Sequence, residues 1–318
     1  MTFRSILALA LALGSAGCLT FDGFVFDGIP CSQVGPDTCD PEDEAWDQVC
    51  VPCGEAYDWQ RDYPWFPQTL APGQTIRPVD PGSVVDLTIG LSGGGEADAV
   101  FLAGHGALAD TTILYSHGNY ANLEHYAPRL RMLHEAGYSV FSWDYRGFGK
   151  TQPETFATPD EFMDDAMAVR DALDALAPDP DRIVLYGYSL GAIPAVEQAL
   201  TRPGCALVLE TPFPSLSNFA EGSTTLALPD QLLSDGRYDN VYKLREHPGP
   251  LLAMAGEVDG LIPPHMVEEL ADANGGPTEF WVVPGSEHGI STKGVPEMGL
   301  DAYFERLSDF LEGTPCGE

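Results

Sequence analysis

The sequence has few basic residues. Its 15 lysines and arginines, only three of them lysines, stand against 48 acidic residues in a chain of 318, and the formal net charge is −33. Nucleic-acid binders contact phosphates through Lys and Arg, so this balance excludes a nucleic acid as partner. It also disfavours polyanionic substrates and docking on an anionic lipid surface. Because 44% of the residues are hydrophobic, the chain can still form a packed globule.

The sequence also lacks an apolar run long enough to span a bilayer. The short run Ile6–Leu13 follows Arg4 and precedes the small residues 14–17, which is the pattern of an export signal. Cys18 comes next, and this arrangement resembles the lipobox of bacterial lipoproteins, although Ser15 stands where that family prefers Leu. We expect a signal peptide over residues 1–17 and a lipid on Cys18, with cleavage after position 16 or 17 as the alternative.

The expected location follows from this signal. We expect the protein to be exported and lipid-anchored to the bacterial cell envelope, at the outer membrane or in the periplasm, and otherwise to be secreted. A membrane partner is expected only through this N-terminal anchor.

No complete metal or nucleotide motif is present. Cys50 and Cys53 have the spacing of half a zinc site, but Cys31 and Cys39 do not supply a second half. The residues 149–151 resemble the end of a phosphate-binding loop, yet Asp144 stands where that motif needs Gly. We therefore expect no metal and no cofactor.

The seven cysteines favour disulfides in an exported chain. Cys31, Cys39, Cys50 and Cys53 lie close together, and the sequence does not choose among their three pairings. Zinc binding or redox chemistry at Cys50 and Cys53 are alternatives. A bridge between Cys205 and Cys316 would join a core strand to the C-terminus.

We expect the chain to divide into a loop-rich, cysteine-rich segment over residues 18–75 and one larger domain over residues 76–318. From about residue 76, short apolar runs alternate with helical patterns, which is typical of an α/β sheet covered on both faces. We expect strands at Val84–Ile89, Ala99–Ala103, Thr112–Ser116, Tyr138–Trp143, Arg182–Gly187, Ala206–Glu210, Pro250–Ala255 and Glu279–Val283. We expect helices to begin near Asn122, Pro159, Leu190, Pro263 and Gly299.

The helix from Pro159 has the clearest sequence signals. Thr158 and Glu161 form a capping box around the proline. The residues Phe162, Ala166, Val169, Leu173 and Leu176 share one face. We interpret the acids of its first two turns, Asp160, Glu161, Asp164 and Asp165, as a solvated face.

Gly187-Tyr-Ser-Leu-Gly191 matches the G-x-S-x-G nucleophile elbow. In this motif the serine occupies a strained turn between a strand and a helix, where side chains at the flanking positions would clash. An apolar run precedes the motif and a helical pattern follows it. The context predicts Ser189 as a nucleophile at the carboxyl end of the sheet.

A nucleophilic serine needs a base, and the base needs an acid that orients it. Asp259 and His288 each follow a strand-like run, in the chain order Ser, Asp, His. Glu257 is the competing acid, but it lies nearer to the strand end. We predict Asp259 as the acid and His288 as the general base.

An oxyanion hole needs two backbone N–H groups. We expect one from Leu190, the residue after the nucleophile. The second should come from Asn119, in the loop that follows the strand ending at Ser116. The pair His105-Gly106 precedes a polar turn, so we interpret it as a decoy.

These ordered motifs resemble the α/β-hydrolases over roughly residues 80–312. The resemblance is closest to the small-cap branch of serine aminopeptidase-like hydrolases, monoacylglycerol lipases and acyl-protein thioesterases, and the residues that carry it are Ser116–Asn119, Asp144–Gly149, Gly187–Gly191, Pro212-Phe213, Gly256–Pro264 and Gly285–His288. It implies an α/β-hydrolase fold: a mostly parallel eight-stranded sheet, helices on both faces and a short cap. It also implies that Asp144 and Arg146 shape a turn. Lys150-Thr151 and the cysteine-rich segment depart from the family pattern.

Specificity should reside in an insertion at about residues 212–248. Its apolar residues, among them Phe213 and Phe219, would either line an acyl site or pack on the sheet edge. We expect an exported serine hydrolase of small-molecule carboxylic esters or thioesters, with neutral or cationic substrates favoured by the charge. The alternatives are an aminopeptidase on the same triad and a non-catalytic binding lipoprotein.

Overall fold

The computed structural model describes residues 83–120, 122–215, 236–290 and 299–317. The predicted signal peptide, Cys18, the four clustered cysteines, Phe219 and much of the predicted cap lie outside the described residues. Within them, no helix has the length and apolar character needed to cross a membrane. The strands are β1 Val84–Gly90, β2 Glu96–Leu102, β3 Thr112–Ser116, β4 Ser139–Trp143, β5 Ile183–Tyr188, β6 Ala206–Glu210, β7 Leu251–Gly256 and β8 Thr278–Val283. The α-helices are α3 Leu123–Glu135, α4 Pro159–Asp174, α5 Ala192–Thr201, α7 Asn240–Leu244, α8 Pro264–Ala273 and α10 Leu300–Glu312.

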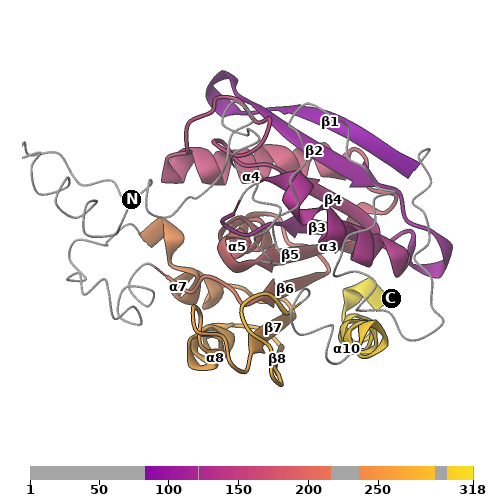
Figure 1. Ribbon diagram of the computed structural model, residues 1–318, viewed down its shortest axis with the longest axis vertical. Helices are drawn as coiled ribbons and strands as arrows, with labels where there is room; N and C mark the ends of the chain where they lie inside the picture. Colours follow the sequence, from indigo (N-terminus) through magenta and orange to yellow (C-terminus); the bar gives the residue numbers. More distant parts are fainter. Residues whose placement is uncertain (1–82, 121, 216–235, 291–298, 318) are drawn as a thin grey trace, which may run out of the picture.

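The eight strands form one sheet in the order β1-β2-β4-β3-β5-β6-β7-β8 (Figure 1). β2 runs antiparallel to β1 and β4, and every other neighbouring pair is parallel. All residues of β3 to β7 are buried, which explains why these strands are nearly continuous apolar runs in the sequence. The predicted fold, a mostly parallel eight-stranded α/β sheet, is confirmed.

Helices cover both faces of the sheet because successive strand residues point to opposite sides (Figure 1). On one face, Leu114 and Leu185 pack with apolar residues of α4, α5, α7 and α8. On the other face, Ile113 and Val184 pack with apolar residues of α3 and α10. The two cores meet at the parallel strands, whose carboxyl ends carry the loops described below.

The predicted element boundaries are close, with two physical differences. β2 begins at Glu96, three residues before the expected start, because Glu96, Ala97 and Asp98 pair with the end of β1 in a hairpin. The helix expected from Leu190 begins at Ala192, because Ser189–Gly191 forms a single 3-10 turn first. The helices expected near Asn122, Pro159, Pro263 and Gly299 begin within one residue of these positions.

α4 confirms the predicted capping box at Thr158 and Glu161. Two other predictions for this helix are wrong. Leu176 lies beyond the helix end and is exposed. Asp165 is not solvated: it is buried and accepts two hydrogen bonds from Arg146, at 2.6 and 2.9 Å. A distant cation therefore holds this acid inside the molecule.

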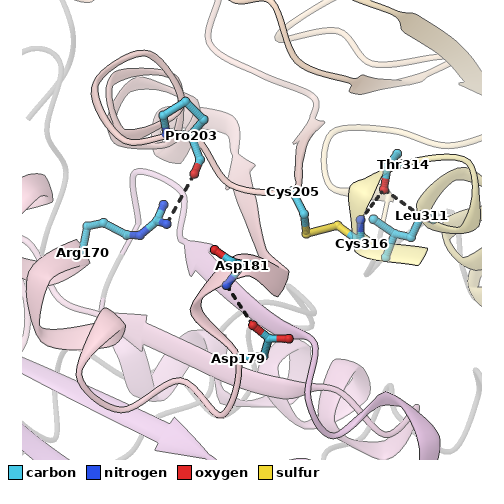
Figure 2. Close-up of a disulfide and its surroundings, with 8 residues drawn as sticks. All are labelled: Arg170, Asp179, Asp181, Pro203, Cys205, Leu311, Thr314 and Cys316. Atoms are coloured by element: carbon cyan, nitrogen blue, oxygen red, sulfur yellow. Dashed lines mark hydrogen bonds between the residues drawn. A yellow bond between two sulfur atoms is a disulfide. The ribbon is translucent and has the colours of Figure 1, made fainter. Parts of the chain in front are cut away.

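The predicted Cys205–Cys316 disulfide is present, with its Cα atoms 5.0 Å apart (Figure 2). It joins the start of β6 to the short turn after α10, and both cysteines are buried. Beside it, the Thr314 hydroxyl accepts a hydrogen bond from the Cys316 N–H and donates one to the Leu311 carbonyl. The C-terminal turn is thus tied to the core sheet.

Candidate active site

Ser189 stands on a sharp turn at the end of β5. Its φ of 50° lies in the left-handed region, which L side chains rarely adopt. A Cβ at Gly187 would lie 2.7 Å from the Ala192 Cα, and a Cβ at Gly191 would overlap the Ser116 carbonyl. Both glycines are therefore required by close backbone approach, as the G-x-S-x-G pattern predicts.

The structure brings Ser189, His288 and Asp259 together, although they are separated by up to 99 residues along the chain. The Nε2 atom of His288 lies 3.1 Å from the Ser189 Oγ, and its Nδ1 atom lies 2.8 Å from the Asp259 Oδ2. Ser189 and Asp259 are buried, whereas His288 is partly exposed. The imidazole thus lies between a hydroxyl and a carboxylate.

Asp259 is held by the backbone of its own loop. Its Oδ1 atom accepts hydrogen bonds from the N–H groups of Leu261 and Ile262, at 2.8 and 2.9 Å. A carboxylate accepts hydrogen bonds through both oxygens, so in this arrangement Nδ1 of His288 is the donor to Asp259 and the lone pair of Nε2 faces the Ser189 hydroxyl.

The loops that carry Asp259 and His288 are joined by further hydrogen bonds. The N–H groups of Glu257 and Val258 donate to the carbonyls of Val283 and Ser286, at 3.0 and 2.9 Å. The Glu257 carboxylate accepts from the Gly285 N–H at 2.8 Å. Glu257, the competing acid of the sequence analysis, therefore bonds the backbone of the His288 loop, whereas Asp259 bonds the imidazole.

The loop after β3 contains Asn119, the predicted second donor of the oxyanion hole. His117 in this loop is fully buried between the rings of Tyr126 and Tyr145, and its Nε2 atom lies 3.2 Å from the Asp144 carboxyl. The Tyr145 hydroxyl also donates to the His117 carbonyl at 2.7 Å. Burial lowers the pKa of His117 to about 4 and raises the pKa of Asp144, so uncharged forms are favoured here.

The two predicted oxyanion donors belong to adjacent segments. Leu190 follows Ser189 directly and is buried. Gly191, the next residue, packs against the Ser116 and His117 carbonyls, which places the β3 loop beside the nucleophile elbow. The Asp144 carboxyl contacts His117 of this loop, which is consistent with the structural role that the resemblance implies. Arg146 instead contacts α4 through Asp165.

His105, the predicted decoy, lies in the connection between β2 and β3. Its N–H donates to the Gly137 carbonyl at 2.9 Å, and its ring contacts His134 near the end of α3. Both contacts are at the amino ends of the parallel strands. Ser189 lies at the opposite, carboxyl ends.

Phe213 belongs to the predicted cap, and the structure describes it next to the nucleophile elbow. Its N–H donates to the Ser189 carbonyl at 2.9 Å, and its carbonyl accepts from the Asn240 side chain at 2.7 Å. The Phe213 ring is buried in the core cluster beside α5 and α7. These contacts favour a packing role for the side chain, one of the two readings that the sequence leaves open.

Sequence reasoning missed three residues around the elbow. Arg129 and Glu210 are charged, buried and paired at 3.4 Å, and Tyr188 lies directly over the arginine. An arginine at an inward position of α3 was the available signal. The motif treats the residue before the serine as variable, so Tyr188 carried no signal of its own.

The chain is similar to known proteins in sequence and in fold. A family model described as serine aminopeptidase, S33, matches residues 108–234. The uncharacterized protein Rv2307c of Mycobacterium tuberculosis is 31% identical over 234 residues, which cover 72% of this chain and 80% of the relative. The chain belongs to the α/β-hydrolase superfamily. It is an α/β-hydrolase of the serine-hydrolase type.

Two solved structures share the fold. The esterase Pf2001 of Pyrococcus furiosus superposes with a TM-score of 0.59 at 21% identity, covering 77% of this chain and 100% of that one. A puromycin-hydrolyzing peptidase of M. tuberculosis gives a TM-score of 0.59 at 18% identity, covering 77% of this chain and 42% of that one. At these identities the likeness concerns the α/β-hydrolase fold alone.

Among the residues that the structure describes, no group of three or more His, Cys, Asp or Glu side chains is arranged to hold a metal ion.

Proposed function

We propose that this α/β-hydrolase cleaves carboxylic esters or thioesters through an acyl-enzyme, with Ser189, His288 and Asp259 as its catalytic triad. The observation that carries the proposal is the continuous line of hydrogen bonds from the Asp259 carboxylate through both nitrogens of His288 to the Ser189 hydroxyl. Such a line is the arrangement in which a base activates a serine and an acid orients the base.

The proposed reaction follows from the proton positions. His288 removes the Ser189 hydroxyl proton through Nε2 as Oγ attacks the carbonyl carbon. The same proton then passes to the departing alcohol or thiol, leaving an ester on Ser189. Water repeats the sequence, with His288 as base and then as acid, and releases the carboxylic acid. Asp259 stabilises the charged imidazole at each stage and stays ionised.

The backbone N–H groups of Asn119 and Leu190 would hold the oxyanion. Two adjacent segments supply them: the β3 loop, fixed by the His117 contacts, and the 3-10 turn that begins at Ser189. Donors that are fixed before the reaction stabilise developing negative charge without reorganising. No cofactor or metal enters this scheme.

Two features should determine which substrates are accepted: the electrostatic field of the negatively charged protein and the exposed residues near the triad. The formal charge of −33 favours neutral esters or substrates with a cationic end over anionic ones. Val258 and Leu261, which flank Asp259, are 56% and 51% exposed and offer apolar surface beside the site. Phe219, which lies outside the described residues, remains a proposed contact of an acyl chain, whereas the contacts of Phe213 favour packing in the core.

The decisive experiment is covalent labelling of the serine. A fluorophosphonate probe should label the wild-type protein, and Ser189→Ala should abolish both labelling and turnover of p-nitrophenyl acetate. The control, Ser92→Ala, changes an exposed serine and should be labelled like the wild type. Undiminished labelling of Ser189→Ala would refute the assignment.

A peptidase reaction on the same triad is the second candidate. The match to the serine aminopeptidase model and the fold shared with a puromycin-hydrolyzing peptidase favour it. Aminoacyl amides compared with acyl esters of graded chain length separate the two activities. A non-catalytic binding lipoprotein is the third reading, and a wild-type protein inert to every ester, amide and phosphonate probe would favour it.

Export also belongs to the proposal. The buried Cys205–Cys316 disulfide supports an oxidising compartment, and Cys18 is the proposed site of a lipid anchor. The full chain expressed in a bacterium should fractionate with the envelope membranes, and Cys18→Ala should not. If the wild type and Cys18→Ala partition alike, lipid anchoring at Cys18 is wrong, and secretion without an anchor is the remaining form of the export proposal.

A further inference from the structure

A charged side chain is buried beneath the candidate active site. Arg129 on α3 is 6% exposed, and its Nη1 atom lies 3.2 Å from the Tyr115 hydroxyl and 3.4 Å from Glu210 Oε1. Its guanidinium carbon lies 3.8 Å from the centre of the Tyr188 ring. The cation thus contacts residues at the carboxyl ends of three neighbouring strands, β3, β6 and β5.

The counter-charge is itself held by hydrogen bonds. The Tyr186 hydroxyl donates to Glu210 Oε2 at 2.5 Å and lies 2.8 Å from the Tyr303 hydroxyl of α10. Burial, followed by the negative charge of Glu210, raises the pKa of Tyr186, so this tyrosine keeps its proton and remains a donor. The arginine and glutamate therefore form a satisfied pair, linked to α10 through two tyrosines.

Tyr188 connects this pair to the three parts of the site. It precedes Ser189 in the chain, and its ring lies 5.5 Å from the His288 ring, centre to centre. A Cβ at Gly118 would lie 2.6 Å from Cε1 of Tyr188, so the oxyanion loop packs directly on this ring. The Tyr188 ring therefore contacts the elbow, the base and the loop that precedes Asn119.

We propose that Arg129, held by Glu210, is a positioning residue that fixes the Tyr188 ring and thereby the relative placement of Ser189, His288 and the Asn119 loop. The proposal builds on the triad of the proposed function. A cation over an aromatic face is attracted by the ring electrons, most strongly where water is excluded. Burying an ion pair carries a desolvation cost that an apolar side chain would avoid. Arg129 lies against the rings of Tyr126 and Tyr188, and we attribute the desolvation cost of burying it to the fixed orientation that it gives the Tyr188 ring.

The test compares two buried arginines. Arg170 on α4 is 3% exposed, and it donates to Asp174 and to the Arg202 carbonyl. Figure 2 shows its hydrogen bond to the carbonyl of Pro203, two residues before Cys205 of the disulfide. Arg129→Met should lower kcat for p-nitrophenyl acetate about 10- to 100-fold with little change in KM, because displaced reacting groups slow the chemical step. Arg170→Met, the matched control, should lose stability but keep its kcat. Equal kcat losses in the two folded variants would overturn the proposal.

The ring itself is tested at Tyr188. Tyr188→Leu should lower kcat as Arg129→Met does, and the double variant should be no worse than either single one, since both changes release the same ring. Tyr188→Phe keeps the stacked ring and should recover most of the activity. If Tyr188→Phe loses as much kcat as Tyr188→Leu, the hydroxyl of Tyr188 is responsible for the effect and the proposal fails. These Tyr188 variants also decide the matter if Arg129→Met does not fold.

A crystal structure separates this proposal from the proposed function. In Arg129→Met, or in Tyr188→Leu if the arginine variant does not fold, the Nε2 atom of His288 should lie beyond hydrogen-bond distance of the Ser189 Oγ, and the Gly118 backbone should shift. An unchanged triad geometry would overturn the positioning role even in a protein without measurable turnover. Conversely, an inactive wild type with a displaced triad in the variant would refute only the proposed activity.

Discussion

At the scale of single residues, two carboxylates two positions apart have different surroundings. Asp259 accepts from the Leu261 and Ile262 N–H groups and faces the imidazole, whereas Glu257 bonds the Gly285 N–H and is exposed. The two residues that separate Asp259 from Glu257 are enough to turn the Asp259 side chain toward the His288 ring. Glu257 instead helps to connect the two loops.

The roles of the two acids predict different losses on amide substitution. Asp259→Asn should lower kcat by about 10³- to 10⁴-fold, because an amide no longer favours the productive imidazole tautomer. Glu257→Gln should lower kcat less than 10-fold, since an amide oxygen can still accept from the Gly285 N–H. Steady-state turnover of p-nitrophenyl acetate measures both. Equal losses would mean that Glu257 shares the orienting role.

At the scale of elements, the sequence predicts the sheet well because five parallel strands are buried on both faces and read as apolar runs. The elbow is predictable because backbone crowding requires glycine at positions 187 and 191. Asp165 was misread and Arg129 was overlooked for one reason: their partners, Arg146 and Glu210, lie 19 and 81 residues away. A pattern with local periodicity cannot show which charge meets a distant partner.

The connection from α7 to β7 predicts a pH dependence of stability. His247 is buried there, its Nδ1 atom lies 2.8 Å from the Asn274 side-chain oxygen, and burial lowers its pKa. Below about pH 6.5 the unfolded chain binds a proton at this histidine that the folded chain resists. The free energy of unfolding should therefore fall as the pH drops from 7 to 5.

Denaturant titrations at pH 7 and pH 5 measure this dependence. The fall should be smaller in His247→Asn than in the wild type. The control His265→Asn removes an exposed histidine and should keep the wild-type dependence. A wild-type slope in His247→Asn would show that other groups dominate this pH range.

At the scale of the whole molecule, the disulfide between Cys205 and Cys316 joins segments 111 residues apart in sequence (Figure 2). The loop it closes contains β6, β7, β8 and α10, together with the loops of Asp259 and His288. Removing a cross-link that closes about 100 residues releases up to about 4–5 kcal/mol of chain entropy in the unfolded state. The bridge therefore stabilises the half of the domain that carries Asp259 and His288, the proposed acid and base.

The double variant Cys205→Ser/Cys316→Ser tests this without leaving a lone thiol. Its free energy of unfolding should be lower than that of the oxidised wild type by about 2–5 kcal/mol. The kcat should change little below the unfolding transition, since neither cysteine contacts the triad. The wild type treated with a reductant is the control, and it should approach the stability of the double variant. Equal stability of the oxidised, reduced and double-serine proteins would mean that the network from Arg129 to Tyr303, and not the bridge, holds α10 to the sheet.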